Sequence, residues 1–412
     1  MRILVVGAGG VGAAVARIAA RRDFFERFVL ADVDERRAAA VITPLDDARF
    51  AAAAVDAADA DAVAALARRA GATHVLNAVD PRFVMPVFEG TFLAGADYLD
   101  MAMSLSRPHP ERPYQQVGVK LGDEQFAQAE RWETAGRLAL VGMGVEPGLS
   151  DVFARYAADH LFEAIDELGT RDGANLVVEG YDFAPSFSIW TTIEECLNPP
   201  LIYESGRGWY TTAPFSEPEV FDFPAGIGPV ECVNVEHEEV ALMPRWIPAR
   251  RVTFKYGLGA EFIDVLRTLH KLGLDRTDPV TVRTTAGPAG VSPRDVVAAC
   301  LPDPATLGDR MRGVTCAGLW VTGRGVDGRP REVYLYHAVD NAWSMAEYGS
   351  QCVVWQTAVN PVVALDLLAE GSWSGAGVLG PEALDPRPFL HRLGQYGPSW
   401  ELRELTPADE AG

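Results

Sequence analysis

The feature that most constrains this chain is a glycine-rich turn near its N-terminus, Gly7-Ala8-Gly9-Gly10-Val11-Gly12. It follows a short apolar run, residues 2–6, and precedes an alanine-rich segment, residues 10–22, with apolar residues at helical spacing. A strand, a Gly-x-Gly-x-x-Gly turn and a helix in this order are typical of a Rossmann phosphate loop. The N-terminus of such a helix offers free N–H groups to a pyrophosphate. The pattern therefore predicts a dinucleotide-binding domain.

An acidic residue at the end of the second predicted strand bears on which dinucleotide binds. Asp32 lies 20 residues after Gly12 (32 minus 12). At this offset a carboxylate meets the ribose hydroxyls of NAD and repels the 2′-phosphate of NADP. Arg36 and Arg37 are near enough in sequence to reach such a phosphate. We therefore predict NAD as the cofactor, with NADP as a possible alternative.

Further cofactor contacts are predicted at strand ends, because ligands bind outside the carboxyl ends of parallel strands. For each of them, an ordinary turn residue is the alternative interpretation. The candidates are Val33 beside Asp32, Asp56 at the adenine edge after the third strand, and Asn77, Ala78 and Val79 after the fourth.

Strand-like and helix-like segments alternate over the first 150 residues, which predicts parallel βαβ units. Residues 1–148 are therefore expected to form an α/β Rossmann domain. The pattern changes afterwards to strand-like runs, at 251–256, 280–284, 316–322 and 332–337, with Gly- and Pro-rich connections. It predicts a second, α+β domain with a mostly antiparallel sheet over 149–345, followed by a helical C-terminal segment, 346–412.

Composition excludes several classes of protein. The chain has 36 Lys and Arg against 57 Asp and Glu, a formal net charge of −21, which disfavours nucleic acids and anionic membranes as partners. Its five cysteines are scattered without a C-x-x-C pair, and no ligand spacing indicates a metal site, so neither disulfides nor a metal are expected. We also expect no apolar stretch as long as the roughly 18 residues that a membrane-spanning helix needs. These observations predict a soluble, cytoplasmic protein.

Several short motifs follow in a characteristic order. Asn77-Ala78-Val79 and Tyr98-Leu99-Asp100 end predicted strands, and Gly142-Met-Gly-Val-Glu-Pro-Gly-Leu149 holds a Gly-x-x-Pro-Gly turn. Phe187-Ser188, Asn198-Pro199 and Thr253-Phe-Lys-Tyr256 come next, before a long stretch from Gly349-Ser350-Gln351 to Pro388-Phe389-Leu390. In this order the motifs resemble the saccharopine dehydrogenase family over nearly the whole chain.

The resemblance implies a Rossmann domain to which the C-terminal helices return, a homodimer formed through the middle domain, and redox chemistry at a carbon–nitrogen bond. Members reduce an imine formed between an amine and an aldehyde, or run that step backwards. The C-terminal stretch is most similar to the carboxynorspermidine type. Asp32 departs from that type, and the segment Gly169-Thr-Arg-Asp-Gly173 departs from the Cys-Gly-Gly of both the saccharopine and the carboxynorspermidine types. The lysine 6-dehydrogenase and homospermidine types look alike at this level.

Three residues are candidates for proton transfer. Glu146 and Asp100 stand at carboxyl ends of predicted strands, where a bound substrate would lie. His237 lies in the acidic run Glu236-His237-Glu238-Glu239, and flanking carboxylates raise a histidine pKa. For each one the alternative is an ordinary turn or solvated loop residue.

Four residues are candidates for holding the substrate. Lys255 and Arg155 could pair with a substrate carboxylate, although a surface ion pair is the alternative for Arg155. Phe187 and Ser188 follow from the family resemblance. His337 lies in an apolar strand and is expected to be a core residue.

Together these features predict an NAD(P)-dependent oxidoreductase that acts on a C–N bond of an amino-acid-like or polyamine-like small molecule. Oxidative deamination of a terminal amine, as in lysine 6-dehydrogenase, is one alternative. A non-catalytic NAD-binding regulator is another, and a synthase that keeps its NAD and shows no net redox change is a third.

Overall fold

The computed structural model describes residues 1–405, and its first layer is a parallel sheet of seven strands. The strand order is β19-β6-β5-β4-β1-β2-β3, and every neighbouring pair is parallel. The strands are β1 (Arg2–Val6), β2 (Arg27–Asp32), β3 (Phe50–Ala54), β4 (His74–Asn77), β5 (Asp97–Asp100), β6 (Leu138–Leu140) and β19 (Gly377–Leu379). The predicted Rossmann fold is therefore confirmed.

Helices lie between successive strands of this sheet, which is the βαβ arrangement that parallel strands need. Apolar side chains dominate the central strands because both faces of a parallel sheet are covered. The alanine-rich strand β3 forms at the edge, where it pairs with β2. The connecting helices are α1 (Gly10–Ala19), α2 (Glu35–Ile42), α3 (Ala60–Ala70), α4 (Val84–Ala94), α5 (Asp123–Phe126) and α6 (Ala129–Thr134).

The second layer is a nine-stranded sheet, ordered β10-β9-β13-β7-β17-β18-β20, with β12 paired to β13 and β11 to β12. The sheet is mostly antiparallel, as predicted, and among the described residues its one parallel pair joins the long strands β7 and β13. Its strands are β7 (Phe162–Ala174), β9 (Leu201–Glu204), β10 (Gly208–Thr211), β11 (Glu219–Phe223), β12 (Gly228–Asn234), β13 (Ala249–Gly257), β17 (Val314–Gly325), β18 (Pro330–Asp340) and β20 (Glu401–Glu404).

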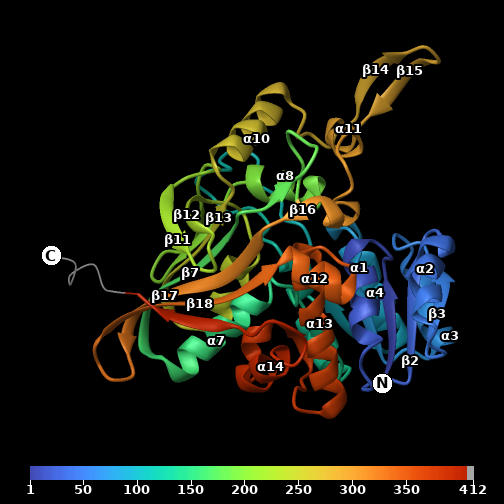
Figure 1. Cartoon of the computed structure of the whole chain (residues 1–412), viewed down its shortest axis with the longest axis horizontal. Helices are drawn as coiled ribbons and strands as arrows, with labels where there is room; N and C mark the ends of the chain where they lie inside the picture. Colours follow the sequence, from blue (N-terminus) through green and yellow to red (C-terminus); the bar gives the residue numbers. More distant parts are fainter. Residues whose placement is uncertain (406–412) are drawn as a thin grey trace.

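Helices and two short strand pairs surround this sheet. The hairpin β14–β15 projects away from the body of the protein (Figure 1). The remaining strands are β8 (Val177–Val178), β14 (Val280–Thr284), β15 (Gly287–Val291) and β16 (Met311–Arg312). The helices are α7 (Leu149–His160), α8 (Ile189–Leu197), α9 (Glu239–Leu242), α10 (Ala260–Leu272), α11 (Pro293–Cys300), α12 (Asn341–Tyr348), α13 (Cys352–Glu370) and α14 (Pro386–Leu393).

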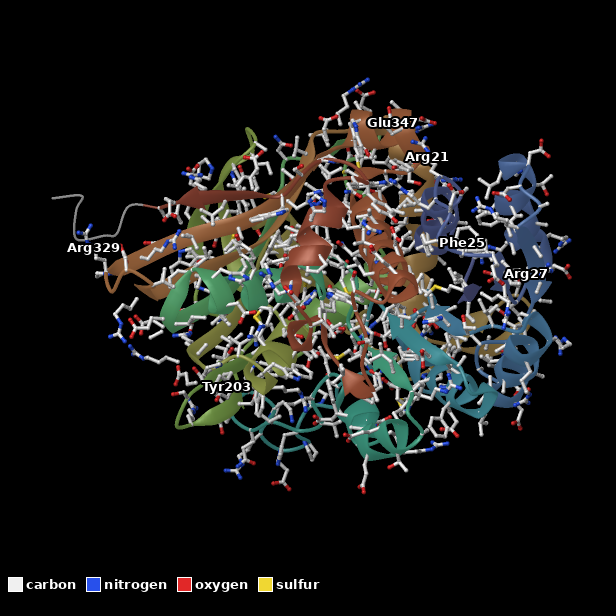
Figure 2. All side chains as sticks on the ribbon, turned by 90° about the horizontal axis from the view of Figure 1, so that it is seen from below. Arg21, Phe25, Arg27, Tyr203, Arg329 and Glu347 are labelled. Atoms are coloured by element: carbon white, nitrogen blue, oxygen red, sulfur yellow. The ribbon has the colours of Figure 1, made fainter. Side chains whose placement is uncertain are left out.

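The C-terminal segment returns to the Rossmann domain, as predicted. Helix α13 packs against α1, and the two lie side by side with α12 in Figure 1. An ion pair of 3.3 Å joins Arg21, just after α1, to Glu347 of α12 (Figure 2). The segment also supplies β19 to the first sheet and β20 to the second, which the helical pattern did not predict. It therefore ties both sheets together.

Helix α13 corrects one expectation. By length and composition it is apolar enough to cross a membrane, although we expected no such stretch. In the structure, 78% of its most apolar window is buried inside the protein. Its hydrophobicity is thus accounted for by packing, as in the core helix of a globular fold.

Candidate active site

The glycine-rich loop has the geometry that a pyrophosphate site requires. Gly9 is the N-cap of α1, and a Cβ added to it would meet open space, where a phosphate could approach the backbone. A Cβ on Gly12 would lie 1.9 Å from the Gly7 carbonyl oxygen, so only glycine lets helix and strand pack this closely. Gly7 has φ +112°, a conformation that favours glycine. The loop therefore fits NAD(P).

Asp32 is positioned by this loop. Its carboxylate accepts a hydrogen bond of 2.9 Å from the Ala8 N–H and one of 3.2 Å from the Asp34 N–H. Arg37 lies 3.7 Å from Asp32, and Arg36 pairs with Asp34 at 2.8 Å. Both candidate partners of a 2′-phosphate thus lie beside carboxylates.

The other predicted cofactor residues divide into two groups. Asn77, Ala78 and Val79 line a cavity together with Gly9, Gly10 and Val11. The Asn77 amide is fixed by the Tyr98 hydroxyl at 3.0 Å and the Val79 N–H at 3.2 Å. Val33 and Asp56 lie outside this cavity, exposed after β2 and β3. Their predicted contacts to the cofactor remain predictions.

The cavity has a volume of about 310 Å³ and extends from the phosphate loop to the second sheet. Its wall combines the turn after β6, the strands β7 and β13, the start of α8 and the start of α13. Seven titratable carboxyl and imidazole groups border it: Asp80, Glu146, Asp172, Glu195, His237, Glu238 and Asp303. Within residues 1–405, no Lys or Arg lines it. With the exception of His237 and the phenol of Tyr256, the titratable side chains of its wall are therefore carboxyl groups.

Glu146 and Asp172 form a carboxyl pair in this wall. Ser150 Oγ donates to Glu146 Oε1 at 2.8 Å, and the Gly318 N–H donates to the same oxygen at 3.1 Å. Burial and the nearby Asp172 charge raise the pKa of Glu146 well above its usual range. Burial also raises the pKa of Asp172, to about 6. The neighbouring Glu146 carboxyl and the positive charge of His237 limit this increase. At neutral pH the pair therefore holds one proton and one negative charge.

His237 stacks on Phe254 at a ring-centroid distance of 3.9 Å, and its Nδ1 lies 2.5 Å from Glu239 Oε2. Burial alone would lower the His237 pKa, but Glu239, Glu195 and Glu238 outweigh it and raise the pKa to about 10. His237 is thus an imidazolium at neutral pH, available as an acid but not as a base. The alternative of a solvated loop is wrong, because residues 236–239 are all buried.

Glu195, on α8, lies 4.0 Å from the other nitrogen of His237. Burial raises its pKa to about 8, because the neighbouring carboxylates Glu238, Glu239 and Asp172 add to the burial effect and together outweigh the His237 charge. Two acids of one cavity, Glu195 and Asp172, are thereby held in opposite protonation states at neutral pH. Such a separation is the usual arrangement for acid–base catalysis.

Three of the predicted site residues, Asp100, Lys255 and Arg155, do not line the cavity. Asp100 accepts from the Gly142 N–H at 2.6 Å and from Gln125 at 2.7 Å, so its two oxygens hold the turn after β6 and helix α5. Lys255 points to the opposite face of β13 from Tyr256 and pairs with Glu219 at 2.6 Å. Arg155 forms an ion pair with Asp159 one turn along α7. None of the three borders the cavity, since alternation along a strand and the helix surface direct them away.

Phe187 and Ser188, which the family resemblance implied as substrate-binding residues, line the cavity, and Ser188 is the N-cap of α8. His337 is a buried core residue as expected, with its Nε2 3.0 Å from the Pro398 carbonyl. Asp172, Glu195 and Tyr256 also border the cavity but were not predicted. The one available signal was the departure at residues 169–173, which contains Asp172.

We expected no set of side chains that converges as metal ligands do, but the structure contains one. Ligand atoms of His237, Glu238 and Glu239 lie within 4.8 Å of one another. His237 Nδ1 and Glu239 Oε2 form an ion pair of 2.5 Å, whereas Glu239 Oε1 is buried without a hydrogen-bond partner.

Comparison with known proteins places these features in context. Residues 3–140 match the saccharopine dehydrogenase NADP binding domain, and residues 144–398 match the saccharopine dehydrogenase C-terminal domain. The chain is 31% identical to carboxynorspermidine synthase of Vibrio alginolyticus over 416 residues, covering 99% of this chain and 98% of the relative. It is 30% identical to carboxyaminopropylagmatine dehydrogenase of Synechocystis over 400 residues, covering 97% and 96%.

Solved structures agree on the fold. Saccharopine dehydrogenase (L-Glu forming) from Saccharomyces cerevisiae superposes with a TM-score of 0.70 at 14% identity, covering 98% of this chain and 100% of that one. Homospermidine synthase from Legionella pneumophila, in complex with NAD, gives a TM-score of 0.65 at 13% identity, covering 100% and 93%.

Proposed function

This chain belongs to the saccharopine dehydrogenase family and is an NAD(P)-dependent oxidoreductase acting on a C–N bond, and we propose that it reduces the imine formed between a polyamine-like amine and an aldehyde. The observation that carries the proposal is the charge of the cavity. Its wall holds carboxylates and one imidazolium but, among the described residues, no Lys or Arg. A substrate amine enters as an ammonium ion, which such a wall stabilises, whereas a dicarboxylic amino acid needs cationic partners.

The names of the relatives support the same substrate class. Carboxynorspermidine and carboxyaminopropylagmatine are both linear polyamines that carry a carboxyl group, and the chain aligns with the corresponding proteins almost from end to end. The predicted substrate cations, Lys255 and Arg155, lie outside the cavity. This placement favours a polyamine-like over an amino-acid-like substrate.

The residues of the wall suggest how the imine forms. Asp172, ionised at neutral pH, holds the substrate ammonium and accepts one of its protons, so that the free amine adds to the aldehyde carbon. Glu195, protonated at neutral pH, donates a proton to the hydroxyl of the adduct, which leaves as water. The resulting iminium cation lies among carboxylates that stabilise its charge.

Reduction completes the reaction. Bound NAD(P)H supplies the hydride, and the phosphate loop with Asn77, Ala78 and Val79 would position it at the cavity. The product is a secondary amine, and one proton is consumed overall as it leaves as an ammonium ion. Glu146 stays protonated at neutral pH because burial and the nearby Asp172 charge raise its pKa, so it adds no second negative charge beside Asp172.

The direct test is an absorbance assay at 340 nm. We expect NAD(P)H oxidation when a linear diamine and a short aldehyde are present together, but not with either alone, and a secondary amine as product. Aldehydes with and without a carboxylate are compared. Ammonia release on adding lysine and NAD(P)⁺, without need of an aldehyde, would instead favour oxidative deamination. Tight cofactor binding without any turnover would indicate a regulator.

We further propose that NADH is the preferred cofactor, because Asp32 occupies the ribose position and Arg36 is already paired with Asp34. In a thermal-shift titration, NADH is expected to stabilise the protein at lower concentrations than NADPH. Asp32→Ala should remove the difference, since the carboxylate that repels a 2′-phosphate is gone. Stronger stabilisation of the unmodified chain by NADPH would contradict the prediction.

The proposal includes a homodimeric, cytoplasmic enzyme that binds neither nucleic acid nor membranes. The net charge of −21 supports the lack of anionic partners. Sedimentation velocity gives the oligomeric state directly.

A further inference from the structure

A second cavity, of about 500 Å³, opens next to the catalytic one. The two share part of their lining, namely Asp172, Phe187, Tyr256, Thr315 and Val353. Because these five residues border both spaces, the two cavities adjoin at the Asp172 carboxylate. The second space is called the distal chamber below.

The outer part of the distal chamber has its own chemistry. Phe183 and Phe262 face each other at a ring-centroid distance of 5.0 Å, and Tyr181 lies at the rim. Asp182 and Glu261 are its two carboxylates besides Asp172. No ion pair or hydrogen bond joins either of them to another side chain between residues 1 and 405. Their charges are therefore free to meet a ligand.

The lining holds no compensating cation. Within the described part of the chain, Lys, Arg and His are all absent from the wall of the distal chamber. Aromatic rings accept both a methylene chain and a cation, the latter through the negative faces of their π-systems. The chamber thus combines an aromatic wall with two exposed carboxylates, Asp182 and Glu261, each next in sequence to one of the two phenylalanines. The nearest cation in contact with the lining is Arg310, which lies over the Tyr181 ring at 5.9 Å.

We propose that the distal chamber binds the second cationic group of a long linear amine whose first nitrogen reacts beside Asp172. The inference rests on the proposed function for the position of the reacting nitrogen. It adds that the enzyme selects a diamine or guanidinoalkylamine long enough to pass Phe183 and Phe262. A short diamine keeps both charges within the catalytic cavity and gains nothing from Asp182 and Glu261.

Binding of two matched amine pairs tests this without turnover. The first pair is 1,5-diaminopentane and n-hexylamine, which have equal length but differ in the distal charge; the second is 1,3-diaminopropane and n-butylamine. Each is titrated calorimetrically into the NAD⁺-saturated full chain. We expect the long diamine to bind roughly tenfold more tightly than its monoamine, since two partly exposed charge contacts contribute an effect of that order.

The double variant Asp182→Asn, Glu261→Gln should abolish this preference for the long diamine and leave the short pair unchanged. Asp264→Asn is the matched control, because Asp264 lies on the same helix α10 but outside the chamber, facing Arg267. The charge-preserving variant Asp182→Glu, Glu261→Asp should restore the preference, which separates lost charge from faulty folding.

Two results would overturn the inference: equal binding of 1,5-diaminopentane and n-hexylamine by the unmodified chain, or a preference that persists in the double neutral variant. Either result leaves the proposed function intact if the absorbance assay shows imine reduction. Conversely, a charge-dependent preference without any turnover supports the chamber and refutes the proposed reaction.

Discussion

Replacing Asp172 with asparagine is expected to lower kcat about 10²- to 10³-fold, the usual contribution of a positioned acid or base. Asp172 borders both cavities and forms a carboxyl pair with Glu146. Asparagine has nearly the same shape but neither holds an ammonium ion by charge nor accepts its proton. The measurement is steady-state kinetics with the amine and aldehyde that the unmodified chain uses.

The pH profile separates this chemical role from a structural one. In the unmodified chain, kcat/KM should rise as pH increases through about 6, where Asp172 loses its proton, and fall through about 8, where Glu195 loses its own. Asp172→Asn should remove the lower limb. It should also move the upper limb to lower pH, because the Asp172 charge is one cause of the raised pKa of Glu195.

Asp166→Asn is the matched control for this experiment. It makes the same change on the same strand, β7, at an exposed site where Asp166 pairs with Arg250 at 2.9 Å. Its kinetics and pH profile should match those of the unmodified chain. An Asp172→Asn variant with a normal melting temperature and kcat within threefold of the unmodified value would rule out the proposed role.

The second large effect is expected in the phosphate loop, where two glycine-to-alanine changes should fail in different ways. Gly9→Ala adds a methyl group that meets no protein atom within 4 Å, and Gly9 has an ordinary φ of −73°. The fold should therefore be unaffected. The methyl group occupies the space of a phosphate, so cofactor affinity should fall about 10- to 100-fold through lost charge-assisted hydrogen bonds.

Gly12→Ala should instead damage the fold, because its Cβ would lie 1.9 Å from the Gly7 carbonyl oxygen, a backbone atom. Such overpacking costs typically about 1–3 kcal/mol, which lowers the melting temperature of the cofactor-free chain by roughly 5 °C. Thermal melts with and without NADH measure both effects. A fall in the melting temperature of cofactor-free Gly9→Ala, or none in Gly12→Ala, would contradict this account of the loop.

Local sequence was sufficient for the first domain because its signals depend on neighbouring residues. The glycine spacing, the preceding strand and the offset of Asp32 all lie within one βαβ unit, and the structure forms them as predicted. The order of motifs likewise pointed to the family and to the return of the C-terminal helices. The strand β19 was missed, because three residues that complete a sheet built some 240 residues earlier carry no pattern of their own.

The active site could be predicted only in part, because it is assembled from distant elements. Glu146 and His237 were found from a strand end and an acidic run. Glu195 lies on a helix without a local signal, and for Asp172 the only signal was the departure from the family at residues 169–173. Lys255 shows the limit most clearly. It and Tyr256 are adjacent, but the pleat of β13 directs one to Glu219 and the other to the cavity.

The sequence by itself determined the nucleotide-binding domain, the position of Asp32 at the end of β2 and the family. Tertiary structure alone decided which acids share one cavity, that no Lys or Arg among the described residues joins them, and that a second chamber continues beyond Asp172. The physical reason is that protonation states and charge complementarity depend on burial and on distances through space. Both are fixed when the two sheets pack together, and neither can be obtained from spacing along the chain.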